Sequence, residues 1–165
     1  MEEKVVRAGE IIRLHAPLII AYSGGADSTC LLALAVRAAG GGVLAAIADS
    51  PSLPRAALAE ALEAAARIGA KVEVISTAEF ESEDYLSNPA NRCYFCKAAL
   101  FSALEKMACG RGFRAIAYGE NADDPADLRP GSRAAAEFHV LAPLKAAGIS
   151  KAEVRAISRQ FGLPT

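Results

Sequence analysis

The chain has 165 residues, of which 53% are hydrophobic and 22% are charged, and its formal net charge is −1. This length fits one compact domain, and the hydrophobic fraction excludes a disordered chain. A net charge near zero argues against a protein that binds nucleic acid through a broad basic surface. Alanine supplies 37 residues, which favours helices and a core of small side chains.

Apolar segments of two kinds alternate along the chain. Short continuous apolar runs predict buried strands, and longer segments rich in alanine and leucine predict helices. The predicted strands are 17–22, 43–48, 71–75, 113–118 and 140–143, and the predicted helices are 1–15, 27–39, 54–68, 92–109, 133–138 and 150–161. Because strands alternate with helices, we expect one doubly wound α/β domain over residues 1–165, with a parallel five-stranded sheet.

Two further features concern the loops and the compartment. The acidic, turn-rich segment 77–91 is long for a loop, and loops of this length are usually functional. The sequence predicts no membrane-spanning helix and no signal peptide, because charged residues interrupt the N-terminal apolar pattern. Four cysteines in such a chain favour free thiols, a metal site or redox chemistry over a disulfide framework. We therefore expect a cytoplasmic protein without a membrane partner.

The segment Ser-Gly-Gly-Ala-Asp-Ser at 23–28 follows the first predicted strand and opens the next helix. Glycines allow the backbone to approach a ligand closely, and a helix N-terminus attracts anions. Asp27 could hold Mg²⁺ on a bound phosphate or cap the helix. The segment lacks the lysine of a Walker A loop and the third glycine of a dinucleotide fingerprint. We interpret it as a phosphate-binding loop formed by Ser23, Gly24, Gly25, Asp27 and Ser28.

A second polar loop, Gly119 to Pro125, follows the fourth predicted strand and contains Asn121 and Asp124. Ligands of such sheets bind beyond the carboxyl ends of the strands, so this loop should face the phosphate-binding loop. Its carboxylates suit Mg²⁺, although a turn with solvated acidic side chains would have the same sequence.

The third motif is Arg-Cys-Tyr-Phe-Cys-Lys at 92–97. Cys93 and Cys96 could be half of a metal site, a redox pair, reactive thiols at a helix start, or packing residues. A complete zinc site is not expected because no second Cys-x-x-Cys pair exists. Arg92 and Lys97 are candidate anion contacts.

Two further segments contain candidate ligand contacts. Arg129 and Arg133 could clamp a phosphate or carboxylate, with Asp127 orienting one of them, or they could belong to a surface turn and a helix start. Asp49 and Ser50 end the second predicted strand, where a nucleotide base or ribose would lie; helix-entry chemistry also explains the neighbouring serine and prolines.

The hexapeptide at 23–28 resembles the pyrophosphatase (PP) loop, Ser-Gly-Gly-x-Asp-Ser, of the N-type ATP pyrophosphatases. Members of that superfamily, which include NAD synthetase, GMP synthetase and tRNA-thiolating enzymes, cleave ATP between the α and β phosphates. They adenylate a substrate oxygen and release pyrophosphate. The resemblance implies an adenine nucleotide alpha hydrolase-like (Rossmann-like) fold, with ATP and Mg²⁺ as cofactors.

Five segments together resemble the LarE-type ATP-dependent sacrificial sulfur transferases, which adenylate a pyridinium mononucleotide carboxylate and then transfer sulfur to it in nickel-pincer nucleotide synthesis. These segments are 23–28, 48–55, 88–97, 119–124 and 127–131, and 92–97 is the most specific of them. Family chains continue past a Gly-Leu-Pro-Thr segment into a half that carries the sulfur-donor cysteine. The resemblance therefore implies that residues 1–165 are the adenylating half. Glu120 departs from the superfamily, where threonine is commoner, and could add a metal ligand or have no role.

The resemblance implies a role for each candidate residue. Asp27 and Asp124 would share the metal and, with Arg129, form the catalytic set. Arg92, Lys97 and Arg133 would bind a carboxylate or mononucleotide substrate. The nucleotide would contact Ser23, Gly24, Gly25, Asp27, Ser28, Asp49, Ser50, Gly119 and Asn121.

The expected function is ATP-dependent adenylation of a carboxylate as the activating step of a sulfur transfer, in a homo-oligomer or beside a partner chain that supplies the sulfur-transfer half. Two alternatives stay open. The same ATP chemistry could serve amidation, as in NAD or GMP synthetase, or tRNA thiolation, which the near-zero charge disfavours. The chain could instead be a non-catalytic nucleotide-binding subunit that needs a partner.

Overall fold

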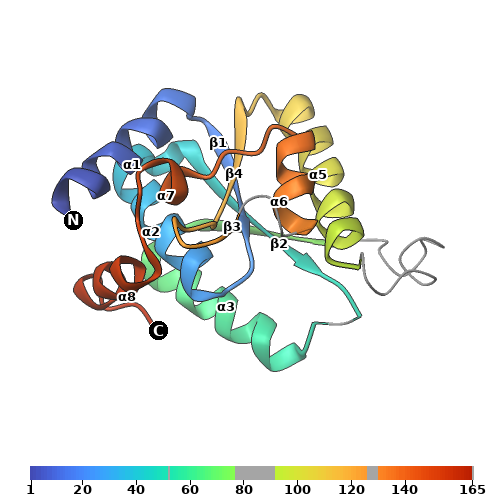
Figure 1. The fold of residues 1–165 in the computed structure, drawn as a ribbon. Helices are drawn as coiled ribbons and strands as arrows, with labels where there is room; N and C mark the ends of the chain where they lie inside the picture. Colours follow the sequence, from blue (N-terminus) through green and yellow to red (C-terminus); the bar gives the residue numbers. More distant parts are fainter. Residues whose placement is uncertain (52, 77–91, 126–129, 165) are drawn as a thin grey trace.

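The computed structural model describes residues 1–51, 53–76, 92–125 and 130–164 (Figure 1), with side chains for all of these except 92–96, 130 and 131. Helices and strands alternate along the chain, as the apolar pattern predicts. The elements are α1 (Glu2–His15), β1 (Leu18–Tyr22), α2 (Ala26–Ala39), the 3-10 turn η1 (Gly40–Gly42), β2 (Val43–Asp49), α3 (Arg55–Ile68), β3 (Lys71–Ser76), α5 (Arg92–Arg111), β4 (Ala115–Tyr118), α6 (Pro130–Glu137), α7 (Pro143–Ala146) and α8 (Lys151–Gln160).

The described strands form a parallel sheet in the order β3-β2-β1-β4. Leu18 of β1 pairs with Val43 of β2 on one side and with Ala115 of β4 on the other. All five residues of β1 are buried, because the strand has a neighbour at each edge and helices over each face. β3 lies at the edge of the sheet, and its alternating sequence matches its partial exposure.

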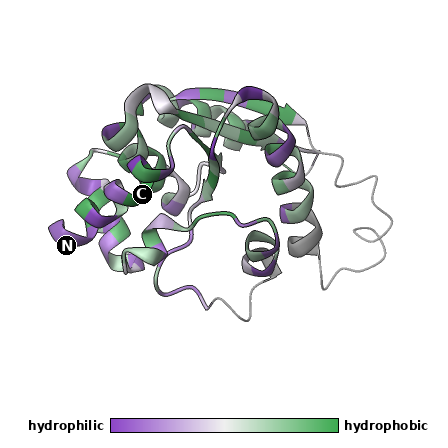
Figure 2. Cartoon of the chain, turned by 90° about the horizontal axis from the view of Figure 1, so that it is seen from above, coloured by the Kyte–Doolittle hydropathy of each residue, from purple (hydrophilic) through white to green (hydrophobic). Residues whose placement is uncertain are grey.

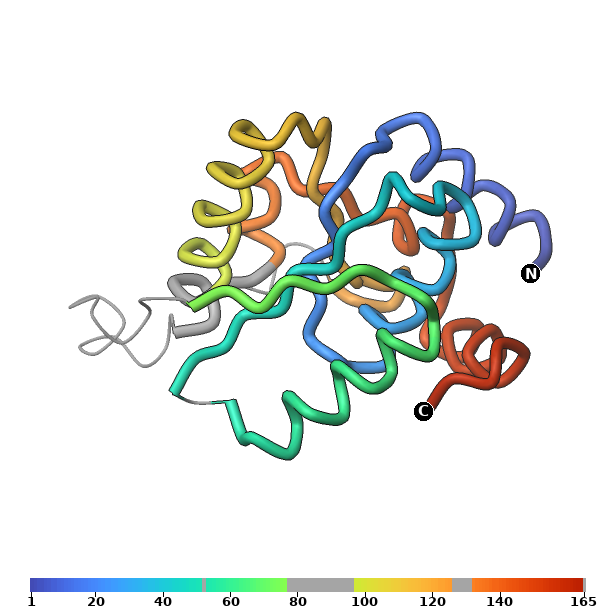
Figure 3. The backbone as a smooth tube through the Cα atoms, turned by 180° about the vertical axis from the view of Figure 1, so that it is seen from behind, coloured from blue at the N-terminus to red at the C-terminus, as the bar shows by residue number. Residues whose placement is uncertain are grey.

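The two faces of the sheet have separate hydrophobic cores. Leu18, Ile20 and Tyr22 pack in one core with residues of α2, α3 and α8, whereas Ile19 and Ala21 pack in the other with α5 and α6. Figures 1 and 3 show α5 and α6 on one side of the sheet and α1, α2 and α8 on the other. In Figure 2 the central strands are mostly green, while the helices alternate between green and purple. The doubly wound α/β architecture predicted from the sequence is therefore confirmed.

The segment predicted as a fifth strand, 140–143, adds one bridge to the sheet. Leu141 pairs in parallel with Ala117: its N–H donates to the Ile116 carbonyl at 2.8 Å, and its carbonyl accepts from the Tyr118 N–H at 2.9 Å. Pro143 begins α7 directly afterwards. Proline has no N–H to donate to a ladder and favours the first turn of a helix, so the pairing ends there and the sheet has four described strands.

Helix α8 begins at the predicted capping box. The Ser150 hydroxyl accepts from the Glu153 N–H at 3.2 Å, and the Glu153 carboxylate accepts from the Ser150 N–H at 2.9 Å. Lys4 of α1 donates to both Glu153 carboxylate oxygens, at 3.0 and 3.1 Å. The backbone hydrogen bond from Ser150 and then the Lys4 ammonium hold the pKa of Glu153 below its ordinary value.

A carboxylate with a lowered pKa in the folded state stabilises the fold above its unfolded pKa and loses that contribution as the pH falls through its folded pKa. The wild type should therefore be more stable than Glu153→Gln at pH 7, and the difference should shrink below about pH 4.5. Urea unfolding of both proteins from pH 7 to pH 3 measures this difference. Glu10→Gln, at an exposed position of α1, is the control. A difference that stays constant across this range would contradict the assignment.

Candidate functional site

The loop between β1 and α2 is a tight turn stabilised by its own two serines. Gly24 has a φ of +82°, a left-handed conformation that glycine adopts without steric penalty. The Ser23 and Ser28 hydroxyl oxygens lie 3.0 Å apart, and the Ser28 hydroxyl accepts from the Ser23 N–H at 3.2 Å. The Gly25 N–H donates to the Ser23 hydroxyl at 3.3 Å. These bonds hold both hydroxyls beside the first turn of α2.

The N-terminus of α2 has no side-chain cap. Its N-cap residue is Gly25, which has no side chain to cap the N–H groups of the first helical turn. The first N–H groups of a helix lack intrahelical partners and form the positive end of the helix dipole. Asp27 lies in this first turn without capping it, which removes one of the two roles that the sequence leaves open for this residue.

Gly119 brings the end of β4 into direct contact with this turn. A Cβ atom at Gly119 would lie 2.6 Å from the Ser28 backbone nitrogen and 2.8 Å from the Asp27 carbonyl carbon. These backbone atoms cannot rotate away as the end of a side chain can, so the contact requires glycine. The loop after β4 and the loop after β1 therefore meet at the carboxyl edge of the sheet, as the sequence predicts.

Asp27 is held from two sides by residues distant in the sequence. Its Oδ1 accepts from the Lys151 ammonium of α8 at 3.0 Å, and its Oδ2 accepts from the Asn121 side-chain amide at 3.3 Å. Asn121 is buried, and its backbone N–H donates to the Asp124 carboxylate at 3.1 Å. Asn121 thus links Asp27 and Asp124, the two carboxylates predicted to share a metal.

The acidic loop after β4 is bound to α7 and α8 as well. The Asp123 carboxylate accepts from the Lys151 backbone N–H at 2.9 Å, and the Lys145 ammonium donates to the Asp124 carbonyl at 2.7 Å. Within the described residues, no three His, Cys, Asp or Glu side chains form a group that could enclose a metal ion. Mg²⁺ commonly takes only one or two carboxylates from a protein and completes its ligand set with water and substrate phosphates.

Glu120 is almost fully buried and anchors three elements. The Tyr118 and Ser132 hydroxyls donate to its two carboxylate oxygens, and the Lys145 ammonium lies 3.6 Å from one of them. Both oxygens are therefore engaged by the protein. The sequence leaves open a metal-ligand role for Glu120, and these contacts favour a structural one.

Two clefts flank the Ser23–Ser28 loop. The first, of about 270 Å³, lies at the junction of β1 and β4. Lys97 of α5 and Lys151 line it, together with Ala21, Ser23, Gly25, Ala26, Asp27, Ser28, Tyr118 and Gly119. Lys97 is a predicted site residue, whereas Lys151 is missing from the sequence-based set. The capping box located its helix but gave no indication that this lysine reaches Asp27.

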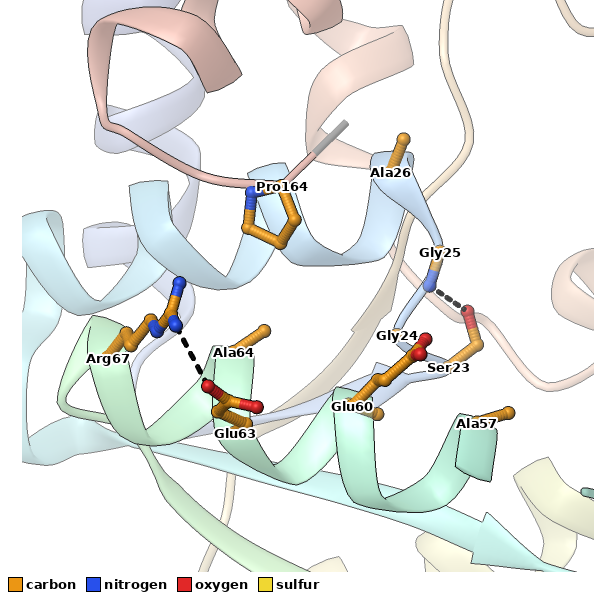
Figure 4. A pocket seen from close by; sticks show the side chains of 11 residues that line it. Ser23, Gly24, Gly25, Ala26, Ala57, Glu60, Glu63, Ala64, Arg67 and Pro164 are labelled. Carbon is orange, nitrogen blue, oxygen red and sulfur yellow. Dashed lines mark hydrogen bonds and ion pairs between the residues drawn. The ribbon is translucent and has the colours of Figure 1, made fainter. Parts of the chain in front are cut away.

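The second cleft, of about 460 Å³, lies on the other side of the loop. Figure 4 shows Gly24 and Gly25 across it from Ala57, Glu60 and Ala64 of α3. The loop therefore borders both clefts. Among the described residues, Lys97, Lys151 and Asp27 are the charged residues of the first, and Glu60, Glu63 and Arg67 are those of the second.

Asp49 and Ser50 follow β2, as predicted. The Asp49 carboxylate accepts from the Arg55 guanidinium, with one contact of 3.1 Å, and this hydrogen bonding lowers the pKa of Asp49. Ser50 is buried. Neither is among the described residues that line the two clefts, so their assignment to a nucleotide stays a prediction.

The remaining predicted site residues either line neither cleft or lie outside the described residues. Arg133 is exposed on α6. Arg129, Asp127 and the segment 77–91 lie outside the described residues, as do the side chains of Arg92, Cys93 and Cys96.

The two described cysteines are free. Cys109 is exposed, and burial raises the pKa of the Cys30 thiol to about 11, which keeps it protonated at neutral pH. Cys30 is fully buried in the hydrophobic core of one sheet face. No helix in the described ranges has both the length and the apolar character that a membrane crossing requires.

Comparison with curated proteins identifies two relatives above 30% identity. An uncharacterised protein of Synechocystis is 43% identical over 146 residues, which are 88% of this chain and 54% of that protein. The pyridinium-3,5-bisthiocarboxylic acid mononucleotide synthase of Lactiplantibacillus plantarum is 32% identical over 87% of this chain and 52% of the synthase. The chain thus spans about half the length of the curated relatives it matches. No protein-family model matches it.

Solved structures share the fold at low sequence identity. The NH3-dependent NAD synthetase of Campylobacter jejuni superposes with a TM-score of 0.75 at 17% identity, covering 98% of this chain and 73% of the synthetase. The U34-tRNA thiolase of Methanococcus maripaludis superposes with a TM-score of 0.70 at 15% identity, covering 98% of this chain and 65% of the thiolase. These likenesses agree with the adenine nucleotide alpha hydrolase-like fold that the sequence implies.

Proposed function

We propose that this chain, a member of the PP-loop ATP pyrophosphatase superfamily, adenylates a carboxylate substrate. The proposal starts from its homology to the pyridinium-3,5-bisthiocarboxylic acid mononucleotide synthase. ATP would bind at the Ser23–Ser28 loop, and pyrophosphate would leave. The activated carboxylate would then accept sulfur, as the name of the relative implies.

The observation that supports this proposal most directly is the composition of the 270 Å³ cleft. Three sources of positive potential converge there: the uncapped N-terminus of α2, the Lys97 ammonium and the Lys151 ammonium. The Ser23 and Ser28 hydroxyls add hydrogen-bond donors at the same place. This combination suits the β and γ phosphates of ATP, which carry the charge that leaves as pyrophosphate.

The reaction is a displacement at the α phosphorus. A carboxylate oxygen of the acceptor forms a bond to the α phosphorus, the bond from that phosphorus to the bridging oxygen breaks, and both electrons leave with pyrophosphate. The protein would contribute by holding the phosphates in line with the acceptor and by stabilising the charge that develops on the leaving group. On this proposal the charge would develop beside Lys151, Lys97 and the α2 N–H groups, which border the same cleft.

The carboxylates present fit a magnesium ion bound mainly through substrate phosphates. Asp27 and Asp124 would hold it, because hard carboxylate oxygens are the ligands that Mg²⁺ prefers. The ion would neutralise phosphate charge when bound. Lys151 now occupies one oxygen of Asp27, so we expect this ammonium to transfer from Asp27 to a phosphate when ATP binds.

The test is pyrophosphate release from Mg-ATP, with and without a carboxylated pyridinium mononucleotide. Pyrophosphate that appears only with the acceptor, together with formation of the acyl adenylate, would support the proposal. Release with nicotinic acid adenine dinucleotide and ammonia instead would favour an amidation. ATP binding without pyrophosphate under any of these conditions would replace the proposal with a nucleotide-binding subunit that needs a partner chain.

Lys151→Met tests the phosphate contact assigned to α8. Loss of a charged hydrogen bond of this kind should raise the KM for ATP about tenfold or more. Lys106→Met, at an exposed position of α5, removes the same charge away from the cleft and should leave the KM unchanged. Steady-state pyrophosphate release over a range of ATP concentrations measures both variants. An unchanged KM in Lys151→Met would remove Lys151 from the phosphate site.

A further inference from the structure

Tyr22, the last residue of β1, makes a hydrogen bond to a helix backbone. Its side chain is only 2% exposed, and its hydroxyl donates to the carbonyl oxygen of Ala61 in the middle of α3 at 2.7 Å. Burial raises the pKa of Tyr22 above its ordinary value, at which the hydroxyl is already protonated and able to donate at neutral pH. This bond fixes the position of α3 relative to the end of β1.

The methyl group of the same alanine lies against the Ser23–Ser28 loop. A Cβ atom at Gly24 would come within 2.7 Å of the Ala61 Cβ and 3.4 Å of its Cα. Gly24, which has a left-handed conformation, therefore packs closely against Ala61 and cannot move toward α3. Ala61 thus contacts Tyr22 through its carbonyl group and Gly24 through its methyl group.

We propose that Tyr22 is a positioning residue of the phosphate loop, which it acts on through Ala61. The hydrogen bond sets the distance between α3 and β1, and the Ala61 methyl group transmits this distance to Gly24. Tyr22 is not among the described residues that line either cleft, so it acts without touching the nucleotide. The inference rests on the proposed function in one respect: the affinity for ATP is the quantity that reports a change in the position of the loop.

Tyr22→Phe removes the hydroxyl and keeps the buried ring. We expect the KM for ATP to rise about fivefold, the size of effect that loss of one hydrogen bond produces. The kcat should change less than twofold, because Lys97 and Lys151, which do not belong to the loop, would still face the charge that develops on pyrophosphate. A purely structural role would lower the melting temperature and leave the KM unchanged.

A double-mutant cycle tests the route through Ala61. Ala61→Gly removes the methyl group that faces Gly24, and with it the shortest contact through which the hydroxyl of Tyr22 would act on the loop. In this background, Tyr22→Phe should change the KM for ATP less than twofold. An equal factor in both backgrounds would overturn the proposal, as would an unchanged KM in the single variant.

Ile12→Val, in the core between α1 and the sheet, is the control for lost stability. It removes one buried methylene group far from the loop, and its KM for ATP should match that of the wild type. A KM raised as much as in Tyr22→Phe would overturn the positioning role. If the wild type binds ATP without releasing pyrophosphate, the proposed adenylation is wrong. The role of Tyr22 can still be tested, because calorimetry gives the ATP dissociation constants of the same variants.

Discussion

Asp27→Ala should lower the rate of acceptor-dependent pyrophosphate release by at least about a hundredfold. Asp27 is the carboxylate in the first turn of α2, and it lies between Lys151 and Asn121 at the lysine-lined cleft. Its removal would delete one of the two expected magnesium ligands. Single-turnover measurement of pyrophosphate with saturating Mg-ATP gives the rate directly.

The fold should survive this substitution. The Asp27–Lys151 ion pair is partly exposed, and such pairs contribute about 0–1 kcal/mol, so the melting temperature should change by only a few degrees. Asp27→Asn retains the size of the side chain and should be nearly as inactive, because it lacks the charge. Activity retained in either variant would remove Asp27 from the metal site and from catalysis.

Gly119→Ala should reduce both ATP affinity and stability, although it adds only one methyl group. The new Cβ would lie 2.6–2.9 Å from three backbone atoms of Asp27 and Ser28, so β4 and α2 would have to separate. Overpacking of this kind destabilises proteins by about 1–3 kcal/mol. Because the displaced atoms belong to the phosphate loop, the dissociation constant for ATP should rise about tenfold or more.

Gly110→Ala is the matched control for this substitution. Gly110 lies near the end of α5, and a Cβ atom there would meet nothing within 4 Å. Alanine favours a helix by about 0.5–1 kcal/mol relative to glycine, so this variant should be slightly more stable and bind ATP as the wild type does. Calorimetry and urea unfolding of both variants provide the comparison. Wild-type behaviour of Gly119→Ala would show that the contact between β4 and α2 is adaptable.

The sequence predicted the parts of this fold that depend on local pattern. The apolar run that became β1 and the glycine-rich turn after it identified a strand, a loop and a helix N-terminus. Two parallel strands end at the same edge of a sheet, so the contact between the loops at Gly25 and at Gly119 also followed from the sequence. The capping box at Ser150 was confirmed for the same reason, since both of its partners lie within four residues.

The contacts that the sequence did not reveal depend on tertiary packing. Lys151 and Lys145 are ordinary helix residues by pattern, and only the docking of α7 and α8 brings them to the acidic loop. The bond from Tyr22 goes to a backbone carbonyl, which any residue at position 61 would offer, so it leaves no signal in the sequence. Pro143 was included in a predicted strand, although its missing N–H favours the start of a helix instead.

The pairing of β1 with both β2 and β4 has a consequence for the order of events during synthesis. The phosphate loop emerges from the ribosome early, but Gly119 and Lys151, which complete the cleft, are translated much later. A nascent chain that ends at β3 therefore contains the Ser23–Ser28 loop but lacks the residues of α5, β4 and α8 that complete the cleft. Nucleotide can stabilise only the chain in which β4 and α8 have docked, because a ligand favours the state that contains its complete site. If ATP binds as proposed, cellular ATP would thus favour chains with the complete cleft over their precursors, and would protect newly made chains only after α8 has folded.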